Sequence, residues 1–96
     1  MLRKHEILDF LSMHKQELSQ RFSVRRIGLF GSYLHDAEDE QSDLDILVEL
    51  DRPTFDHYMD LKFYLEDRFN HPVDLVLADS VKPRLRPIIS REVAYV

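Results

Sequence analysis

Residues 28–50, GLFGSYLHDAEDEQSDLDILVEL, are the stretch on which any interpretation of this 96-residue chain depends. One apolar run ends at Gly31 and Ser32, and the next begins at Asp43 and Asp45, one residue apart. Two unit charges about 5 Å apart repel each other by roughly 3 kcal/mol at an effective dielectric of 20. The spacing therefore indicates that something holds or binds the two carboxylates.

Residues 44–50 alternate as a β-strand with one apolar face, because successive side chains of a strand point to opposite sides. The two faces are Leu44, Ile46, Val48 and Leu50 on one side, and Asp43, Asp45, Leu47 and Glu49 on the other. The apolar face is expected to meet the core. Both aspartates then project from the opposite face, at the start of the strand.

The rest of the chain reads as helices and strands in alternation. The expected elements are a helix over 2–22 whose apolar stripe is interrupted at His14 and Lys15, a strand over 24–30, a short helix and loop within 33–41, a helix over 55–69, a strand over 73–77, and a basic segment from 81 that ends in a short helix. The apolar end of the chain is expected to join the core, or to contact a partner. This order predicts one α/β domain, residues 1–96, with helices flanking a small mixed sheet.

The composition of the chain argues against several classes of function. A net charge of −5 argues against direct binding of nucleic acid over the whole surface, because neutralising phosphates needs clustered cations. It leaves room for a nucleotide held through metal ions. With no cysteine, disulfides and thiolate metal sites are excluded. The charged N-terminus lacks the pattern of a signal peptide, and no apolar run approaches the ~20 residues of a membrane span. We therefore expect a cytoplasmic protein with no membrane partner.

The aspartate pair suits a hard divalent cation. Mg²⁺ prefers carboxylate oxygens and keeps positions open for phosphate and water. Asp74 lies in the expected strand over 73–77 and would join the pair if that strand lay beside residues 44–50. Three carboxylates can hold two metal ions about 3.5–4 Å apart, as in enzymes that displace groups at phosphorus. Taken alone, however, Asp45 could be a solvated strand residue, and Asp74 could lie on an exposed face.

Gly31 and Ser32 could form an anion-binding turn. Glycine lets the backbone approach a phosphate closely, and the backbone N–H groups of a following turn would face the anion. The serine hydroxyl adds a donor. An ordinary turn that ends a strand is the alternative reading of the same two residues.

Taken together, these motifs resemble a known family. Gly31-Ser32, ten intervening residues and then Asp43-Leu44-Asp45 resemble the polymerase-β-like nucleotidyltransferase superfamily. The context F-G-S…S-D-L-D-I-L-V, the short length and the ending KPRLRPIISREVAYV look like its smallest branch, the minimal nucleotidyltransferase (MNT) antitoxins paired with HEPN-domain toxins. The similarity covers nearly the whole chain.

The resemblance implies a fold and a reaction. It implies a minimal nucleotidyltransferase core in which Gly31 and Ser32 hold the β- and γ-phosphates of ATP. It also implies that Asp43, Asp45 and Asp74 hold Mg²⁺, in two ions, with Asp74 helping to deprotonate the attacking hydroxyl. The implied reaction moves AMP from ATP to a tyrosine of a HEPN-type toxin, and pyrophosphate leaves. The chain would then be a protein adenylyltransferase antitoxin in a hetero-oligomer, with a homodimer also open.

One departure from the family keeps a second function open. Members commonly carry arginines soon after the Gly-Ser pair, where this chain has residues 33–36, YLHD, followed by Glu38, Asp39 and Glu40. This favours, as an alternative, a non-catalytic antitoxin that neutralises its partner by contact. Lys82, Arg84 and Arg86, spaced two apart, would point one way in an extended segment, toward a partner or a phosphate, or would belong to a solvated tail. Transfer to a small molecule is a further reading.

Overall fold

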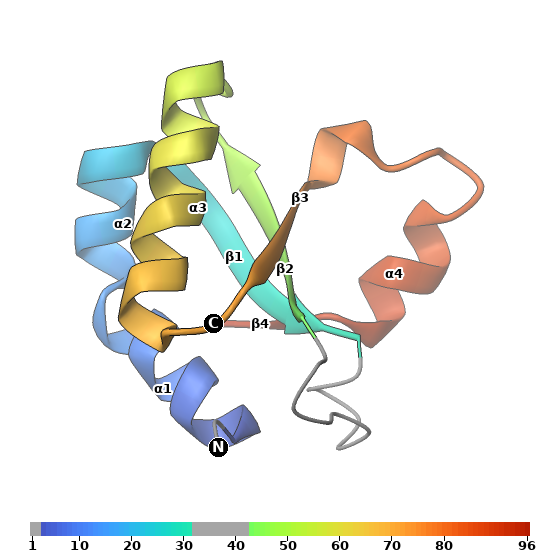
Figure 1. Ribbon diagram of the computed structural model, residues 1–96. Helices are drawn as coiled ribbons and strands as arrows, with labels where there is room; N and C mark the ends of the chain where they lie inside the picture. The colour runs from blue at the N-terminus through green and yellow to red at the C-terminus, as the bar shows by residue number, and fades with distance from the viewer. Residues whose placement is uncertain (1–2, 32–42) are drawn as a thin grey trace.

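The protein has three layers: helices α1 to α3, a four-stranded sheet, and a C-terminal segment on the far side of the sheet (Figure 1). The computed structural model describes residues 3–31 and 43–96. Its elements are α1 (Lys4–Met13), α2 (Lys15–Phe22), β1 (Val24–Phe30), β2 (Leu44–Leu50), α3 (Phe55–Phe69), β3 (Val73–Leu77), a 3₁₀ turn η1 (Ala78–Ser80), α4 (Arg86–Glu92) and β4 (Ala94–Tyr95). The expected mixed sheet flanked by helices is confirmed. The helix and loop expected within 33–41 lie outside the described residues.

The sheet is mixed, with strand order β3-β2-β1-β4. β1 pairs antiparallel with β2 and with β4, whereas β2 and β3 run parallel. A parallel neighbour needs a crossover connection, and α3 supplies it on the helical face of the sheet. Residue 45 of β2 is paired with residue 74 of β3. The fold therefore places two strand aspartates side by side.

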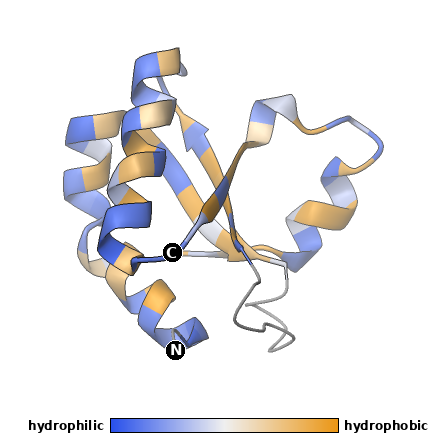
Figure 2. Cartoon of the chain, viewed as in Figure 1, coloured by the Kyte–Doolittle hydropathy of each residue, from blue (hydrophilic) through white to orange (hydrophobic). Residues whose placement is uncertain are grey.

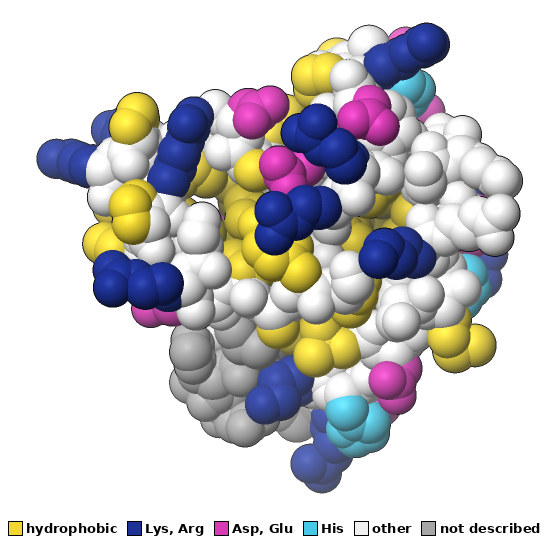
Figure 3. All heavy atoms as spheres, turned by 180° about the vertical axis from the view of Figure 1, so that it is seen from behind, with side chains coloured by type: hydrophobic (Ala, Val, Ile, Leu, Met, Phe, Trp, Pro, Cys, Tyr) yellow, Lys and Arg dark blue, Asp and Glu magenta, His cyan; other side chains and the backbone are white. Residues whose placement is uncertain are grey.

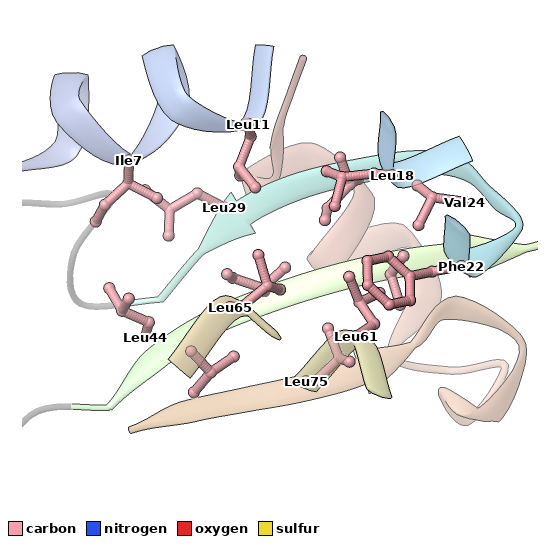
Figure 4. Close-up of a cluster of buried hydrophobic side chains, with 14 of the residues drawn as sticks. Ile7, Leu11, Leu18, Phe22, Val24, Leu29, Leu44, Leu61, Leu65 and Leu75 are labelled. Atoms are coloured by element: carbon pink, nitrogen blue, oxygen red, sulfur yellow. The ribbon is translucent and has the colours of Figure 1, made fainter. Parts of the chain in front are cut away.

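The core lies between the sheet and helices α1 to α3. The apolar faces of the strands meet the apolar stripes of the helices, and alternation of apolar and polar residues along the strands is visible in Figure 2. Leu11, Leu18, Leu29 and Leu65 are fully buried there and point toward one another (Figure 4). Burying such a side chain contributes about 1.5–3 kcal/mol. This packing holds β2 and β3 from the helical side and leaves their opposite face to the aspartates.

The prediction of a single N-terminal helix is wrong at one point. The helix breaks at His14 into α1 and α2. His14 leaves helical geometry at φ −104°, ψ 13°. Its ring stacks on Phe10 at a centroid distance of 4.1 Å, and Nδ1 lies 2.9 Å from the Phe10 carbonyl oxygen. Ile7 and Leu11 of α1, and Leu18 of α2, all lie in the core.

The C-terminal segment differs from expectation in two ways. After α4 the chain forms β4, which pairs with Gly28 and Leu29 of β1. α4 itself contains no buried residue, and Ile88 is 48% exposed, so the apolar residues of α4 do not join the core. We call residues 78–92, which include η1 and α4, the arm. Within the described parts of the chain, no helix is long and apolar enough to cross a membrane.

Candidate active site

The candidate site lies where β1 ends and β2 and β3 begin. Asp45 is half-buried and Asp74 is exposed, and they face each other across the parallel pair. Asp43 is exposed and directly precedes β2. The alternation that sends Ile46 and Val48 into the core sends these carboxylates to the other face, as the sequence predicts.

The carboxylates crowd one another at Asp45. The pKa of Asp45 is raised to about 6, first by burial, then by the charge of Asp74, then by that of Asp43. A hydrogen bond that the protonated carboxyl shares with Asp74 adds to the shift. Full ionisation of the three carboxylates is therefore unfavourable, and a bound cation would make it favourable.

Gly31 closes the site from the end of β1. Its φ is +79°, a left-handed conformation that favours glycine. A Cβ built on Gly31 would overlap the Asp45 carboxylate. The backbone conformation therefore favours glycine here, and any other side chain would also force the Asp45 carboxylate to move. Ser32, the other half of the predicted phosphate-binding turn, lies outside the described residues.

The donor chemistry of the site fits Mg²⁺. Asp45 and Asp74 present carboxylate oxygens on one face, and Asp43 is near enough for its charge to act on Asp45. Over residues 3–31 and 43–96, however, no three His, Cys, Asp or Glu side chains are grouped closely enough to form a complete metal site. Mg²⁺ commonly takes one or two carboxylates and completes its shell with water and substrate phosphates, which agrees with this arrangement.

Lys82, Arg84 and Arg86 do not lie in one extended segment, the condition under which they would share one side of the chain. Residues 83–85 turn rather than extend, and α4 begins at Arg86. Arg86 donates from Nε to the Val81 carbonyl oxygen at 3.0 Å and from Nη2 to that of Asp79 at 3.2 Å. All three cations are exposed, and Arg86 also braces the loop of the arm through these two hydrogen bonds.

Sequence reasoning missed a cluster farther along the same face of the sheet. Glu49 follows Asp45 and Leu47 on that face of β2, and Arg26 of β1 is paired with it. Arg26 Nε lies 3.3 Å from Glu49 Oε2, and the guanidinium carbon lies 3.8 Å from the centre of the Tyr95 ring. The alternation of residues along β2 placed Glu49 on the same face as Asp45. The position of Tyr95, however, depends on β4, which the sequence pattern did not indicate.

Comparisons with known proteins agree on the kind of domain. Residues 11–96 match the nucleotidyltransferase domain family. Protein adenylyltransferase MntA of Thermococcus cleftensis is 43% identical over an alignment of 97 positions that covers 100% of this chain and 98% of the relative. Among solved structures, "Structure of putative minimal nucleotidyltransferase" matches with a TM-score of 0.75 and 31% identity, covering 91% of this chain and 93% of the other.

A second solved structure shows the same fold at lower identity. It is described as a toxin-antitoxin with AMP-PNP, and it matches with a TM-score of 0.69 and 23% identity over 86% of this chain and 69% of the other. At this identity the likeness supports the fold alone.

Proposed function

Because the chain belongs to the nucleotidyltransferase domain family, we propose that it is an Mg²⁺-dependent protein adenylyltransferase that acts as an antitoxin. It would transfer AMP from ATP to a tyrosine hydroxyl of a HEPN-type toxin. The observation that carries this proposal is the facing pair Asp45 and Asp74, crowded by Asp43 and closed by Gly31. The name of the Thermococcus relative supports the choice of a protein as acceptor.

The proposed reaction is a displacement at the α-phosphorus of ATP. The tyrosine oxygen forms a bond to this phosphorus, the bond from the phosphorus to the bridging oxygen of the β-phosphate breaks, and pyrophosphate leaves with the electron pair. Asp74, the more exposed member of the facing pair, accepts the proton of the hydroxyl. Asp43 and Asp45 would hold Mg²⁺ with Asp74. The metal would neutralise charge on the triphosphate and on the leaving group.

The turn at Gly31 would bind the triphosphate. Its left-handed backbone and missing side chain let the chain approach both Asp45 and an anion closely. Ser32 would add its hydroxyl to the β- and γ-phosphates. Electrostatic complementarity of this kind commonly contributes the largest share of catalysis in such transfers.

The proposal includes a protein partner that supplies the acceptor. The arm is a part of the described surface that fits a protein contact. It contains no buried residue in α4, and it exposes Leu85 at 40% and Ile88 at 48% beside Lys82 and Arg84. The lower-identity structural relative is described as a toxin-antitoxin. We propose a hetero-oligomer with the toxin, assembled in the cytoplasm.

The experiment is an intact-mass measurement of the HEPN-type partner after co-expression. The wild-type chain should add the mass of one or more AMP groups. Asp43→Asn/Asp45→Asn should add none. Asp51→Asn, an exposed aspartate just past the other end of β2, is the matched control and should behave as wild type. Full modification by the double variant would contradict the assignment of the site.

A contact-only antitoxin is the second candidate. The acidic run after Gly31, where the family resemblance implies arginines, favours it together with the exposed arm. Growth measurements separate the two functions. Rescue of toxin-producing cells by the double aspartate variant, with no mass change on the partner, would support neutralisation by contact and would contradict enzymatic silencing.

A further inference from the structure

We propose that the hollow between the sheet and the arm binds the base of the nucleoside triphosphate. The inference rests on the proposed function, because it needs a nucleotide whose phosphates lie at Asp45. The hollow has a volume of about 210 Å³ and is bounded by β1, β2, β4 and the arm. Figure 3 shows this face of the molecule, with hydrophobic side chains between the arm on the left and basic and acidic side chains near the centre.

The position of the hollow matches the length of a nucleotide. Asp45, Leu47 and Glu49 share one face of β2, and both Leu47 and Glu49 line the hollow. Four residues of strand span about 13 Å. That separation is comparable with the reach of a nucleoside monophosphate from its phosphorus to the far edge of its base. A nucleotide whose α-phosphate lies beside Asp45 would therefore bring its base to Glu49.

The size of the hollow favours a single ring system. Pockets that enclose a drug-sized ligand measure about 300–1,000 Å³, and this one is smaller. Leu47 and Ile89 supply apolar walls. Tyr95 and the Arg26 guanidinium are stacked on each other at 3.8 Å and line the same hollow. Bases stack on aromatic rings and on arginine planes, and such stacking is worth about 1–3 kcal/mol per base.

Glu49 supplies an acceptor, Oε2, to which no described residue makes a hydrogen bond. Its side chain is only 20% exposed. Oε2 is buried, and no donor in the described ranges is aligned to hydrogen-bond it, although Arg26 lies close enough to balance its charge. A buried acceptor without a hydrogen bond is costly. Glu49 lines the hollow, so a rotation of its side chain would let Oε2 accept from the amino group of adenine, guanine or cytosine. The neighbouring Arg26 could donate to a ring nitrogen or carbonyl of the same base.

The test compares two ligands by calorimetry in the presence of Mg²⁺: ATP, and inorganic tripolyphosphate, which lacks a base. Glu49→Gln and Tyr95→Leu should each weaken ATP binding about tenfold, as expected for loss of one charge-assisted hydrogen bond or one stacking contact. Their affinity for tripolyphosphate should change by less than about twofold, since the phosphates do not contact the hollow. Circular dichroism of each variant checks that the fold is retained.

Two control variants resemble these substitutions but should leave the proposed contacts with the base intact. Tyr95→Phe keeps the aromatic ring and should bind ATP as wild type does. Glu92→Gln removes one charge from the arm outside the hollow and should also leave the ratio of the two affinities unchanged.

The outcomes separate this inference from the proposed function. If Glu49→Gln and Tyr95→Leu leave the ratio of ATP to tripolyphosphate affinity unchanged while the wild type binds both, the base lies elsewhere and the hollow serves another occupant, such as a side chain of the partner. If the wild type binds neither ligand, the proposed enzymatic function fails together with this inference.

Discussion

At the scale of single residues, Asp45 is a position where a side chain proposed for function costs the fold stability. It is half-buried, it faces Asp74, and its pKa is raised to about 6. A Cβ at position 31 would overlap the same carboxylate. A protein without a ligand for this carboxylate would gain stability by replacing it, and sites that keep such a cost are often functional.

Asp45→Asn should make the metal-free protein more stable at pH 7 while abolishing AMP transfer. The raised pKa means that wild-type stability falls as the pH rises from the ordinary value of 3.8 through about 6. The variant lacks this loss, so its advantage should be absent near pH 4 and complete near pH 7. A gain of about 1 kcal/mol would raise the thermal midpoint by about 4–8 °C in a domain of this size. Thermal unfolding in a chelator measures it, and a lower midpoint for Asp45→Asn at pH 7 would contradict the charge crowding.

Gly31→Ala should destabilise the fold by about 1–3 kcal/mol and abolish transfer, because alanine is strained at φ +79° and its Cβ would overlap Asp45. Urea unfolding gives the free energy. Gly31→Asn separates the two causes, since asparagine tolerates a left-handed backbone but still carries a Cβ. Full recovery of stability in Gly31→Asn would show that the overlap with Asp45 is not important.

At the scale of helices and strands, the parallel pairing of β2 and β3 creates the site, and Glu66 of α3 helps to fix where β3 begins. Oε2 of Glu66 accepts a hydrogen bond from the Val73 N–H at 3.0 Å and one from Lys62 Nζ at 3.3 Å. Val73 directly precedes Asp74. The backbone bond to Val73, and then Lys62, lower the pKa of Glu66 against the opposing effect of burial.

Glu66→Gln should therefore lower stability by up to about 1 kcal/mol at pH 7, the usual size of one hydrogen bond. A lowered pKa stabilises the fold above the ordinary value of 4.5, and this contribution is lost as the pH falls through the folded-state pKa. The difference between variant and wild type should thus become smaller as the pH falls below the ordinary value of 4.5. Denaturant unfolding at pH 7 and at pH 3.5 checks it, with Glu6→Gln, at an exposed residue of α1, as the control. A difference that is the same at both pH values would refute the linkage.

How far the elements could be predicted depended on their length. β1, β2, β3 and α3 begin and end where the sequence pattern predicts, because each carries a full apolar period. β4 has two residues and no period to detect, and the interruption of the apolar stripe at His14 and Lys15 did not by itself indicate a break in the helix. Alternation predicted the face of Asp45, but the pairing of Asp45 with Asp74 needed the strand order and register, which are tertiary facts.

At the scale of the whole molecule, the core and the proposed partner contact lie in different layers. The layer of α1 to α3 against the sheet contains the core, whereas the arm contributes nothing buried through α4. Figure 1 shows the arm on the side of the sheet away from the helices. The aspartates and the arm therefore share the face that remains available to a substrate and a protein partner.

The double variant Leu85→Ser/Ile88→Ser should leave the free energy of unfolding within about 0.5 kcal/mol of wild type, as for exposed surface positions. It should also weaken binding to the toxin, because exposed apolar residues of the arm form the proposed contact. Urea unfolding and a pull-down with purified partner measure the two effects. Leu65→Ala, at a fully buried position, is the contrasting control and should cost about 2–5 kcal/mol. Unchanged partner binding by the arm variant would exclude the arm as the contact.

The measurement that tests the central claim most directly follows the phosphates of ATP. Purified chain and toxin are incubated with Mg²⁺ and ATP labelled either at the α- or at the γ-phosphate. We predict that the toxin acquires the α-label and not the γ-label, and that Asp45→Asn abolishes the transfer. Transfer of the γ-label would mean that the site breaks a different bond. Absence of both labels from a toxin that the wild-type chain nevertheless silences would mean that Asp43, Asp45 and Asp74 do not carry out the antitoxin's work.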